Sequence, residues 1–290
     1  MNIRHWISGA RPRTLPAAFA PVIAGTGVAA FDLKISWLEA ALALGVAVSL
    51  QIGVNYANDY SDGIRGTDEK RVGPQRLVAA NLASAKAVKI AALAFLGLGA
   101  LFGFALAALT SWWLLAVGVL AILAAWGYTG GSNPYGYRGL GEVSVFIFFG
   151  LIAVVGTTYV QTRAISTSAI LAGVGVGALA CAILVANNLR DIPTDTAVGK
   201  RTLAVALGDQ KTRVSFVALI VLAFASAAVI ARLATPWALL AFVALPLAVR
   251  ASHQVMNKAK GMDLVSVLKT TGIIELLWAV GLAAGLVIGS

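Results

Sequence analysis

Charged residues are scarce in this sequence. They make up 12% of its 290 residues, whereas an ordinary soluble domain carries about 25%. Hydrophobic residues account for 59%, and the mean hydropathy is +0.87. So few charges cannot cover the surface of a water-soluble domain, which excludes that class and indicates a polytopic protein held in membrane lipid. No polar linker or low-complexity stretch divides the chain, so we expect a single domain over residues 1–290.

Cysteine and histidine are nearly absent. Cys181 is the only cysteine and lies in an apolar run, so no disulfide can form within the chain. The two histidines, His5 and His253, have no partner pattern around them. No zinc site, thiol nucleophile or Ser/His/Asp arrangement is therefore visible in the sequence.

Long charge-poor runs are what the sequence has instead. Runs of roughly 18 to 20 such residues are long enough to cross a bilayer as helices. We therefore expect an all-α membrane protein with nine transmembrane helices in a single bundle, at about 14–31, 38–57, 88–109, 112–129, 143–161, 166–187, 213–231, 234–249 and 270–289.

The basic residues predict the orientation of this bundle. With the N-terminus inside, all of the 22 Lys and Arg residues fall in cytoplasmic segments except Lys34, Arg163 and Arg232. Because cytoplasmic loops carry the excess of Lys and Arg, we expect the N-terminus in the cytoplasm and the C-terminus outside. The net charge of +10 then has a topological cause, and since the basic residues form no aromatic-interleaved stripe, we expect no nucleic-acid partner. The sequence leaves the oligomeric state open.

The end of the second run turns suddenly acidic and rich in amides. Asn55, Asp59 and Asp62 stand at i, i+4 and i+7, which places them on one face of a helix. Far along the chain, Asn187, Asp191 and Asp195 repeat this arrangement at i, i+4 and i+8. Gathered carboxylates repel one another unless a cation sits between them, and hard oxygen ligands favour Mg²⁺. We predict that these six side chains bind metal, with the four aspartates as the catalytic candidates.

Solvated loop acids are the plain alternative, since acids in membrane proteins usually lie in loops. The shared register, the repeated offset from Asn to Asp and the basic residues among the acids favour a site. Both stretches also open onto the two longest cytoplasmic connections, roughly 58–87 and 188–212. A diphosphate bound with Mg²⁺ would suit this mixture, because Arg binds phosphate as a bidentate fork and Lys as a point charge.

The candidate diphosphate ligands are the basic and amide residues near the acids. Each basic residue could equally be no more than a cytoplasmic charge, and each asparagine a helix end. These candidates are Arg65, Arg71, Arg76, Asn58, Asn188, Lys200 and Arg201. Three further residues stay undecided: Asp68 is either a third metal ligand or a turn acid, and Arg11 and Arg13 are either interfacial anchors or ligands.

A third polar stretch, Gly127–Glu142, follows the fourth run. Its mixture of Gly, Pro and Tyr predicts a shaped loop, although a flexible linker would have a similar composition. Tyr135, Tyr137 and Arg138 could stack on and pair with a planar anionic aromatic molecule.

These stretches together resemble the UbiA superfamily of intramembrane prenyltransferases, and within it the branch that acts on naphthoate. The resemblance runs along essentially the whole chain. It is most specific at Asn55–Arg76, Gly127–Glu142 and Asn187–Gly208, and the opening Arg11–Pro16 is similar as well.

The superfamily's first signature is Asn-Asp-x-x-Asp-x-x-x-Asp, and its second is Asp-x-x-x-Asp. Asn58, Asp59 and Asp62 match the first signature, but Gly66 stands at its last position and Asp68 follows two residues later. The second signature is met by Asp191 and Asp195.

The resemblance implies that both aspartate sets bind two Mg²⁺ ions, which hold an allylic polyprenyl diphosphate whose tail lies in a groove open to lipid. It further implies transfer of the prenyl group to 1,4-dihydroxy-2-naphthoate with loss of CO₂, giving demethylmenaquinone. By the same resemblance Tyr135, Tyr137 and Arg138 are candidates for the acceptor side. The site would face the cytoplasm from the cell membrane.

Two alternatives remain open. Another aromatic acceptor would use the same aspartates and differ at the Gly127–Glu142 stretch. A cation-coupled transporter would use acids to bind ions, but transporter sites usually lie near the bilayer midplane, whereas these acids lie towards one face.

Overall fold

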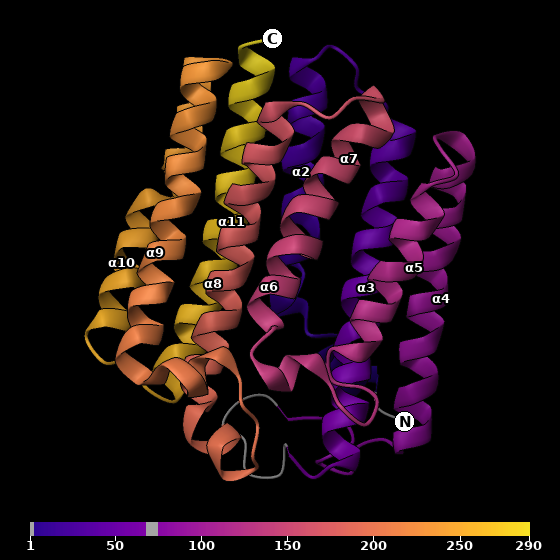
Figure 1. The fold of residues 1–290 in the computed structure, drawn as a ribbon, viewed down its shortest axis with the longest axis vertical. Coiled ribbons are helices and arrows are strands. Elements are labelled where there is room, and N and C mark those ends of the chain that lie inside the picture. The colour runs from indigo at the N-terminus through magenta and orange to yellow at the C-terminus, as the bar shows by residue number, and fades with distance from the viewer. Residues whose placement is uncertain (1–2, 68–74) are drawn as a thin grey trace.

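The computed structural model describes residues 3–67 and 75–290, and throughout them the regular structure is helical (Figure 1). The α-helices are α1 (Ile3–Ala10), α2 (Pro16–Phe31), α3 (Trp37–Ile64), α4 (Ala85–Leu109), α5 (Leu114–Gly127), α6 (Gly141–Val145), α7 (Ala153–Thr162), α8 (Thr167–Ala197), α9 (Leu203–Leu233), α10 (Leu245–Met256) and α11 (Met262–Ile288). Short 3₁₀ segments lie at η1 (Pro12–Thr14), η2 (Tyr135–Arg138) and η4 (Pro236–Ala244), and η3 (Phe146–Ile152) is a π-helix.

Seven helical stretches of the described chain are long and apolar enough to cross a membrane. They are α3, α4, Gly141–Thr162, α8, α9, Pro236–Met256 and α11. An eighth results if the N-terminal pair Ile3–Thr14 and Pro16–Phe31, bent by 47°, is one span, and α5 is a shorter apolar helix. Each of the nine predicted runs thus lies on helix, and the all-α membrane architecture is confirmed, while the count of nine stays a prediction.

The predicted boundaries miss several helix ends. α8 continues ten residues beyond the predicted run, to Ala197, and α3 continues to Ile64, so both acidic stretches lie on helices rather than in connections. α9 and α11 begin earlier than predicted, at Leu203 and Met262. Polar residues end an apolar run without ending the helix, which is why composition alone places these boundaries too early or too late.

The middle of the bundle is built on α8. Of its most apolar 18-residue window, 78% is buried inside the protein, against 28% for α3 and α4. The π-helix packs closely on it: a Cβ placed on Gly150 would lie only 2.5 Å from the Cα of Gly177. Only glycine at position 150 permits this approach of the two backbones. The buried core continues from α8 into α9, α11 and η4, where Phe216, Trp278 and many alanines are enclosed.

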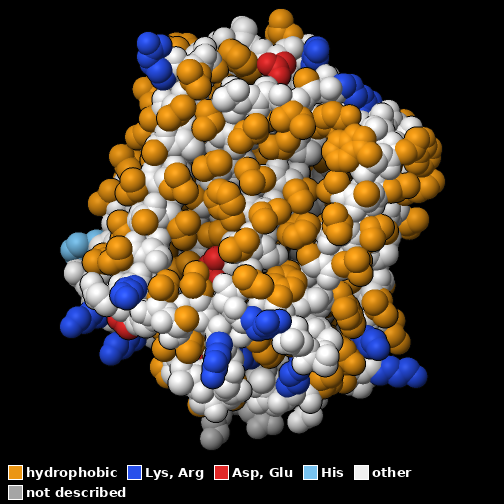
Figure 2. Space-filling view, viewed as in Figure 1, with side chains coloured by type: hydrophobic (Ala, Val, Ile, Leu, Met, Phe, Trp, Pro, Cys, Tyr) orange, Lys and Arg blue, Asp and Glu red, His pale blue; other side chains and the backbone are white. Residues whose placement is uncertain are grey.

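The remaining helices form the opposite wall. In Figure 1, α8, α9, α10 and α11 stand on one side, α3, α4 and α5 on the other, and α2, α6 and α7 between them. The acidic ends of α3 and α8 lie at the same end of the bundle, and the C-terminus lies at the other end. On the face shown in Figure 2, hydrophobic side chains form a broad band across the middle, and more Lys and Arg gather at the lower end than at the upper. Such a band is the surface expected of a protein that lies in lipid.

Candidate functional site

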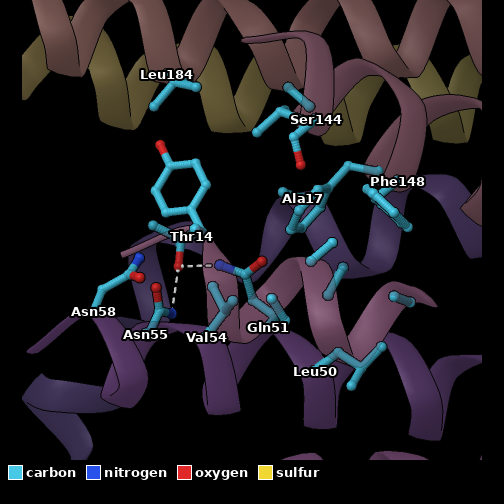
Figure 3. A pocket seen from close by; sticks show the side chains of 18 of the residues that line it. Thr14, Ala17, Leu50, Gln51, Val54, Asn55, Asn58, Ser144, Phe148 and Leu184 are labelled. Carbon is cyan, nitrogen blue, oxygen red and sulfur yellow. Dashed lines mark hydrogen bonds between the residues drawn. The ribbon is translucent and has the colours of Figure 1, made fainter. Parts of the chain in front are cut away.

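A cavity of about 410 Å³ lies between the two walls and includes the acidic ends of α3 and α8. At that end its lining is polar. Farther in, the lining is apolar and comes from α2, α3, α4, α5 and the span that contains the π-helix, with Leu50, Leu106, Val117, Phe148 and Phe149 among the contributing residues (Figure 3). The cavity therefore joins a charged mouth to a hydrophobic interior.

On α3, two of the three residues in the predicted stripe lie at the cavity wall. Asn55 and Asp62 line the cavity, and so does Asn58, but Asp59 is not among the lining residues. The Asp59 carboxylate is fully buried, and its two oxygens accept hydrogen bonds from the backbone N–H groups of Leu77 and Val78, at 2.9 and 3.0 Å. Asp59 therefore fixes the chain that returns after the motif.

Asp62, on α3, contacts Tyr137 of η2 and Lys200 of the connection between α8 and α9. Its Oδ1 accepts a hydrogen bond from the Tyr137 hydroxyl, and the Lys200 Nζ lies 3.5 Å from the same oxygen. Lys200 Nζ also lies 4.4 Å from the centroid of the Tyr137 ring, a cation–π distance. Burial, reinforced by the neighbouring Asp62 carboxylate, raises the pKa of the Tyr137 phenol above its ordinary value. Tyr137 consequently remains a protonated donor at neutral pH.

On α8 the predicted pattern is intact. Asn187, Asp191 and Asp195 all line the cavity, together with Asn188. Arg190 forms a buried ion pair with Asp191 at 2.6 Å and donates to the Asn187 Oδ1 at 2.9 Å. These contacts keep the α8 oxygen atoms at the cavity wall.

The amides predicted to bind diphosphate connect the mouth to the third polar stretch, Gly127–Glu142, which we call the third loop. The Asn58 Oδ1 accepts from the Thr129 hydroxyl at 2.6 Å, and the Asn188 Nδ2 donates to Glu142 at 2.9 Å. Both asparagines line the cavity, so they hold the loop while remaining at the mouth.

Only some of the basic residues predicted to bind ligand line the cavity. Lys200, the buried Arg76 and Arg11 line the cavity. Arg65 does not; its guanidinium instead donates to the backbone carbonyls of Thr129 and Gly131, which ties the end of α3 to the third loop. Arg13 is exposed and lies outside the lining, and the predicted roles of Asp68 and Arg71 fall on residues outside the described part of the chain.

The three residues predicted to bind the aromatic acceptor do not all line the same space. Tyr135 and Tyr137 line the main cavity, with the Tyr135 hydroxyl donating to the carbonyl of Ala124 at 2.7 Å. Arg138 and Arg201 line a separate, more open hollow beside Ser132 and Asn133. Tyr137 borders both spaces and so lies between them.

Thr14 and Gln51 are among the cavity residues that the sequence predictions missed. The Thr14 hydroxyl accepts from the Gln51 Nε2 at 2.9 Å and from the Asn55 Nδ2 at 3.0 Å (Figure 3). The Asn55 amide also donates to the carbonyl of Ala10 at 2.9 Å, so it fastens the bend between α1 and α2. The sequence did contain a signal, since Gln51 stands four residues before Asn55 on the same helical stripe, inside an otherwise apolar run.

Within the described residues, no three Asp, Glu, His or Cys side chains converge closely enough to form a metal cage by themselves. The cavity mouth instead offers carboxylates and amides from two helices. Such a set can share an ion with oxygen atoms of a bound phosphate, which is how Mg²⁺ is usually held.

The sequence profile of the UbiA prenyltransferase family matches residues 18–273. The chain therefore belongs to the UbiA prenyltransferase family. It is 54% identical over 288 residues to the 1,4-dihydroxy-2-naphthoate octaprenyltransferase of Mycobacterium tuberculosis, covering 99% of this chain and 98% of the relative. To the Escherichia coli protein of the same name it is 37% identical over 296 residues, covering 94% and 96%.

Solved structures of the family share the fold. The apo structure of a UbiA homologue from Aeropyrum pernix superposes with a TM-score of 0.69 at 17% identity, covering 94% of this chain and 97% of that one. A UbiA homologue from Archaeoglobus fulgidus, bound to DMAPP and Mg²⁺, superposes with a TM-score of 0.63 at 14% identity, covering 98% and 99%. At such identities the likeness establishes the fold alone.

Proposed function

We propose that this prenyltransferase moves a polyprenyl group from an allylic polyprenyl diphosphate to 1,4-dihydroxy-2-naphthoate, with loss of CO₂, giving demethylmenaquinone. The observation that carries the proposal is one cavity with an acidic, cationic mouth and an apolar interior. A diphosphate with a hydrocarbon tail has the same two parts. The names of the relatives, from 54% to 37% identical over nearly their full lengths, support the naphthoate acceptor.

Mg²⁺ fits the residues at the mouth. Asp62, Asp191 and Asp195 are buried, with exposed fractions of 6%, 5% and 9%, and neutral amide oxygens lie beside them. Because no all-protein cage is present in the described chain, the donor set suits an ion that keeps ligand positions for phosphate oxygens.

We assign two ions to this mouth: Asp62 and Asn55 would hold one, and Asp191, Asp195 and Asn187 would hold the other. Bound Mg²⁺ supplies charge stabilisation for the departing diphosphate. The direct metal role predicted for Asp59 stays a prediction, because both of its carboxylate oxygens accept backbone hydrogen bonds and it is not among the residues that line the cavity. These contacts favour a supporting role for Asp59.

The chain's own residues then provide three things. Lys200 and Arg76 place positive charge beside the leaving group, where fixed charges act strongly because they need not reorganise. The apolar lining excludes water from the electron-deficient prenyl carbon. Phe148 and Phe149 line the cavity, and aromatic rings there can stabilise positive charge.

The topology belongs to the same proposal. We place nine spans in one domain over residues 1–290, with the bent N-terminal pair as the first and α5 as the fourth. The N-terminus then lies in the cytoplasm, the C-terminus outside, and the cavity mouth at the cytoplasmic face of the cell membrane. The basic end of the molecule in Figure 2 supports this orientation.

The test is an assay of membranes containing the protein with Mg²⁺, a polyprenyl diphosphate and 1,4-dihydroxy-2-naphthoate, with the products identified by mass. We expect a prenylated, decarboxylated product and released diphosphate, both abolished by a chelator. A product from 4-hydroxybenzoate or homogentisate but not from the naphthoate would replace the proposed acceptor. The absence of diphosphate release with every acceptor would contradict the whole proposal.

A further inference from the structure

The side chain of Gln51 is the feature that the proposed function does not yet use. It is 5% exposed and lines the cavity. Its Nε2 donates to Thr14, but its Oε1 is buried and has no hydrogen-bond partner in the described part of the chain. Buried polar atoms are nearly always paired, so an unpaired acceptor on a cavity wall points to a ligand that brings a donor.

The neighbouring hydrogen bonds fix which atom of the amide is unpaired. The Thr14 hydroxyl has a single proton, and it donates that proton to the carbonyl of Arg11 at 3.0 Å. Thr14 can therefore only accept from Gln51, which requires the NH₂ group of Gln51 to face Thr14. The oxygen must then point the other way, as Figure 3 shows, towards the side where Ala17 and Phe148 lie. Gln51 consequently offers an acceptor and needs a donor.

The chemistry of the two substrates decides which one can supply it. An ionised diphosphate and a hydrocarbon tail carry no hydrogen-bond donor, and neither does an ionised carboxylate. A hydroxylated aromatic ring does, since each phenolic hydroxyl donates one proton. Of the proposed substrates, only the acceptor can satisfy Gln51.

The position of the amide agrees with this choice. One hydroxyl, that of Thr14, binds both the Gln51 and the Asn55 amides, so the Gln51 amide group lies next to that of Asn55, and Asn55 is about one helical turn from Asn58 at the mouth. Arg11 lines the cavity in the same corner and donates to the carbonyl of Asn55 at 3.3 Å. A ring that carries both a carboxylate and a hydroxyl would meet a cation and an acceptor together.

We propose that Gln51 is an acceptor-binding residue whose Oε1 receives a hydrogen bond from a hydroxyl of the aromatic substrate. The inference rests on the proposed function. Because the oxygen is covered in this structure, the contact forms when the ring enters and displaces the apolar side chains beside it. Asn55 and Thr14 hold the amide so that it presents oxygen rather than nitrogen.

The experiment measures equilibrium binding of three naphthoates to the purified full chain: 1,4-dihydroxy-2-naphthoate and the two analogues that each lack one hydroxyl. Wild-type protein should bind the dihydroxy compound about 5- to 30-fold more tightly than one of the analogues, the value of one buried hydrogen bond. Gln51→Met, which keeps the length of the side chain, should remove this preference and leave the KM for the prenyl diphosphate unchanged.

Two control variants distinguish a loss of hydroxyl recognition from a general structural effect of the substitution. Gln161→Met removes an amide that is not part of the cavity lining and that bonds Thr26, Ser36 and the backbone carbonyl of Thr157, and it should keep the wild-type preference. Thr14→Val removes the hydroxyl that accepts from the Gln51 Nε2 but keeps the Gln51 Oε1, so it should weaken the preference for the dihydroxy compound less than Gln51→Met does.

Each other outcome is decisive. If Gln51→Met weakens all three naphthoates equally, or raises the KM for the prenyl diphosphate instead, Gln51 does not recognise the hydroxyl. If wild-type membranes prenylate no naphthoate, the proposed function is wrong and this inference with it. If they do so and Gln51→Met retains the preference, only the inference is wrong.

Discussion

At the scale of single residues, aspartates that look equivalent in the sequence have different surroundings. Asp62 faces the cavity with Tyr137 and Lys200, whereas Asp59, three residues earlier, faces the backbone at Leu77 and Val78. Residues three apart on a helix point about 60° away from each other, so a cavity on one side can include Asp62 while Asp59, at the edge of the same stripe, packs against another segment. Substitution of Asp59 should therefore mainly affect stability, and substitution of Asp62 should mainly affect activity.

We expect Asp59→Asn to reduce the stability of the protein. An amide offers one acceptor where two backbone donors need partners, and an unpaired buried N–H costs about 1–3 kcal/mol. Asp62→Asn removes charge from the cavity and should reduce diphosphate release by about 100-fold or more, with little change in melting temperature. The measurements are thermal unfolding of the purified protein and diphosphate release from membranes.

The exposed Asp32 provides the control for both, since Asp32→Asn makes the same chemical change outside the cavity. Equal melting temperatures for Asp59→Asn and wild type would show that the two backbone contacts of Asp59 carry little energy. Undiminished diphosphate release by Asp62→Asn would remove Asp62 from the catalytic set.

The sequence could predict the α8 residues well because helical spacing alone determines their common face. It could not predict Asp59, Arg65 or Asn55 as well, because each is bonded to a segment far along the chain: Leu77, Gly131 and Ala10 respectively. Spacing states which side of a helix a residue occupies, and not what packs against that side.

At the scale of elements, the π-helix η3 distinguishes the Gly141–Thr162 span from an ordinary membrane helix. Within it Phe148 and Phe149 line the cavity, and Gly150 lies against α8 immediately after them. π-helical turns are rare and occur often at functional sites. The sequence predicted a span here from its apolar run, but a continuous apolar run has no period that reveals a π-helical turn.

We expect Gly150→Ala to destabilise the protein by about 1–3 kcal/mol, the usual cost of overpacking. The added Cβ would lie 2.5 Å from the Cα of Gly177, so the two helices would have to separate. Gly156→Ala is the matched control in the same span, because a Cβ there meets nothing within 4 Å. Thermal unfolding should show a lower melting temperature for the first variant only. A normal melting temperature for Gly150→Ala would mean that the close packing of η3 on α8 is dispensable.

At the scale of the whole molecule, the positions of the charges relate the fold to the membrane. The acidic ends of α3 and α8, the third loop and most of the Lys and Arg visible in Figure 2 lie at one end of the bundle, and the C-terminus lies at the other. By the positive-inside rule this polarity supports the proposed orientation, in which the cavity mouth faces the cytoplasm. Composition could predict the membrane class and this polarity, because both depend on sums over many residues. It could not determine the number of spans, since a bent pair and a 14-residue helix leave the total between seven and nine.

The number of spans can be measured through the scarcity of cysteine. Replacing Cys181 with Ser removes the only thiol, and single cysteines can then be placed at Lys34, Asn133 and Ser290, which are all exposed. With nine spans and the N-terminus inside, a membrane-impermeant maleimide should label positions 34 and 290 in intact cells and position 133 only after permeabilisation. Labelling of 133 and 290 on the same side would mean an even number of crossings between them, so that one predicted span after the third loop does not cross. Labelling of 34 and 133 on the same side would show instead that one of the three helices between them, α3, α4 or the shorter α5, does not cross the membrane. The side of the membrane assigned to the cavity mouth would then have to be revised.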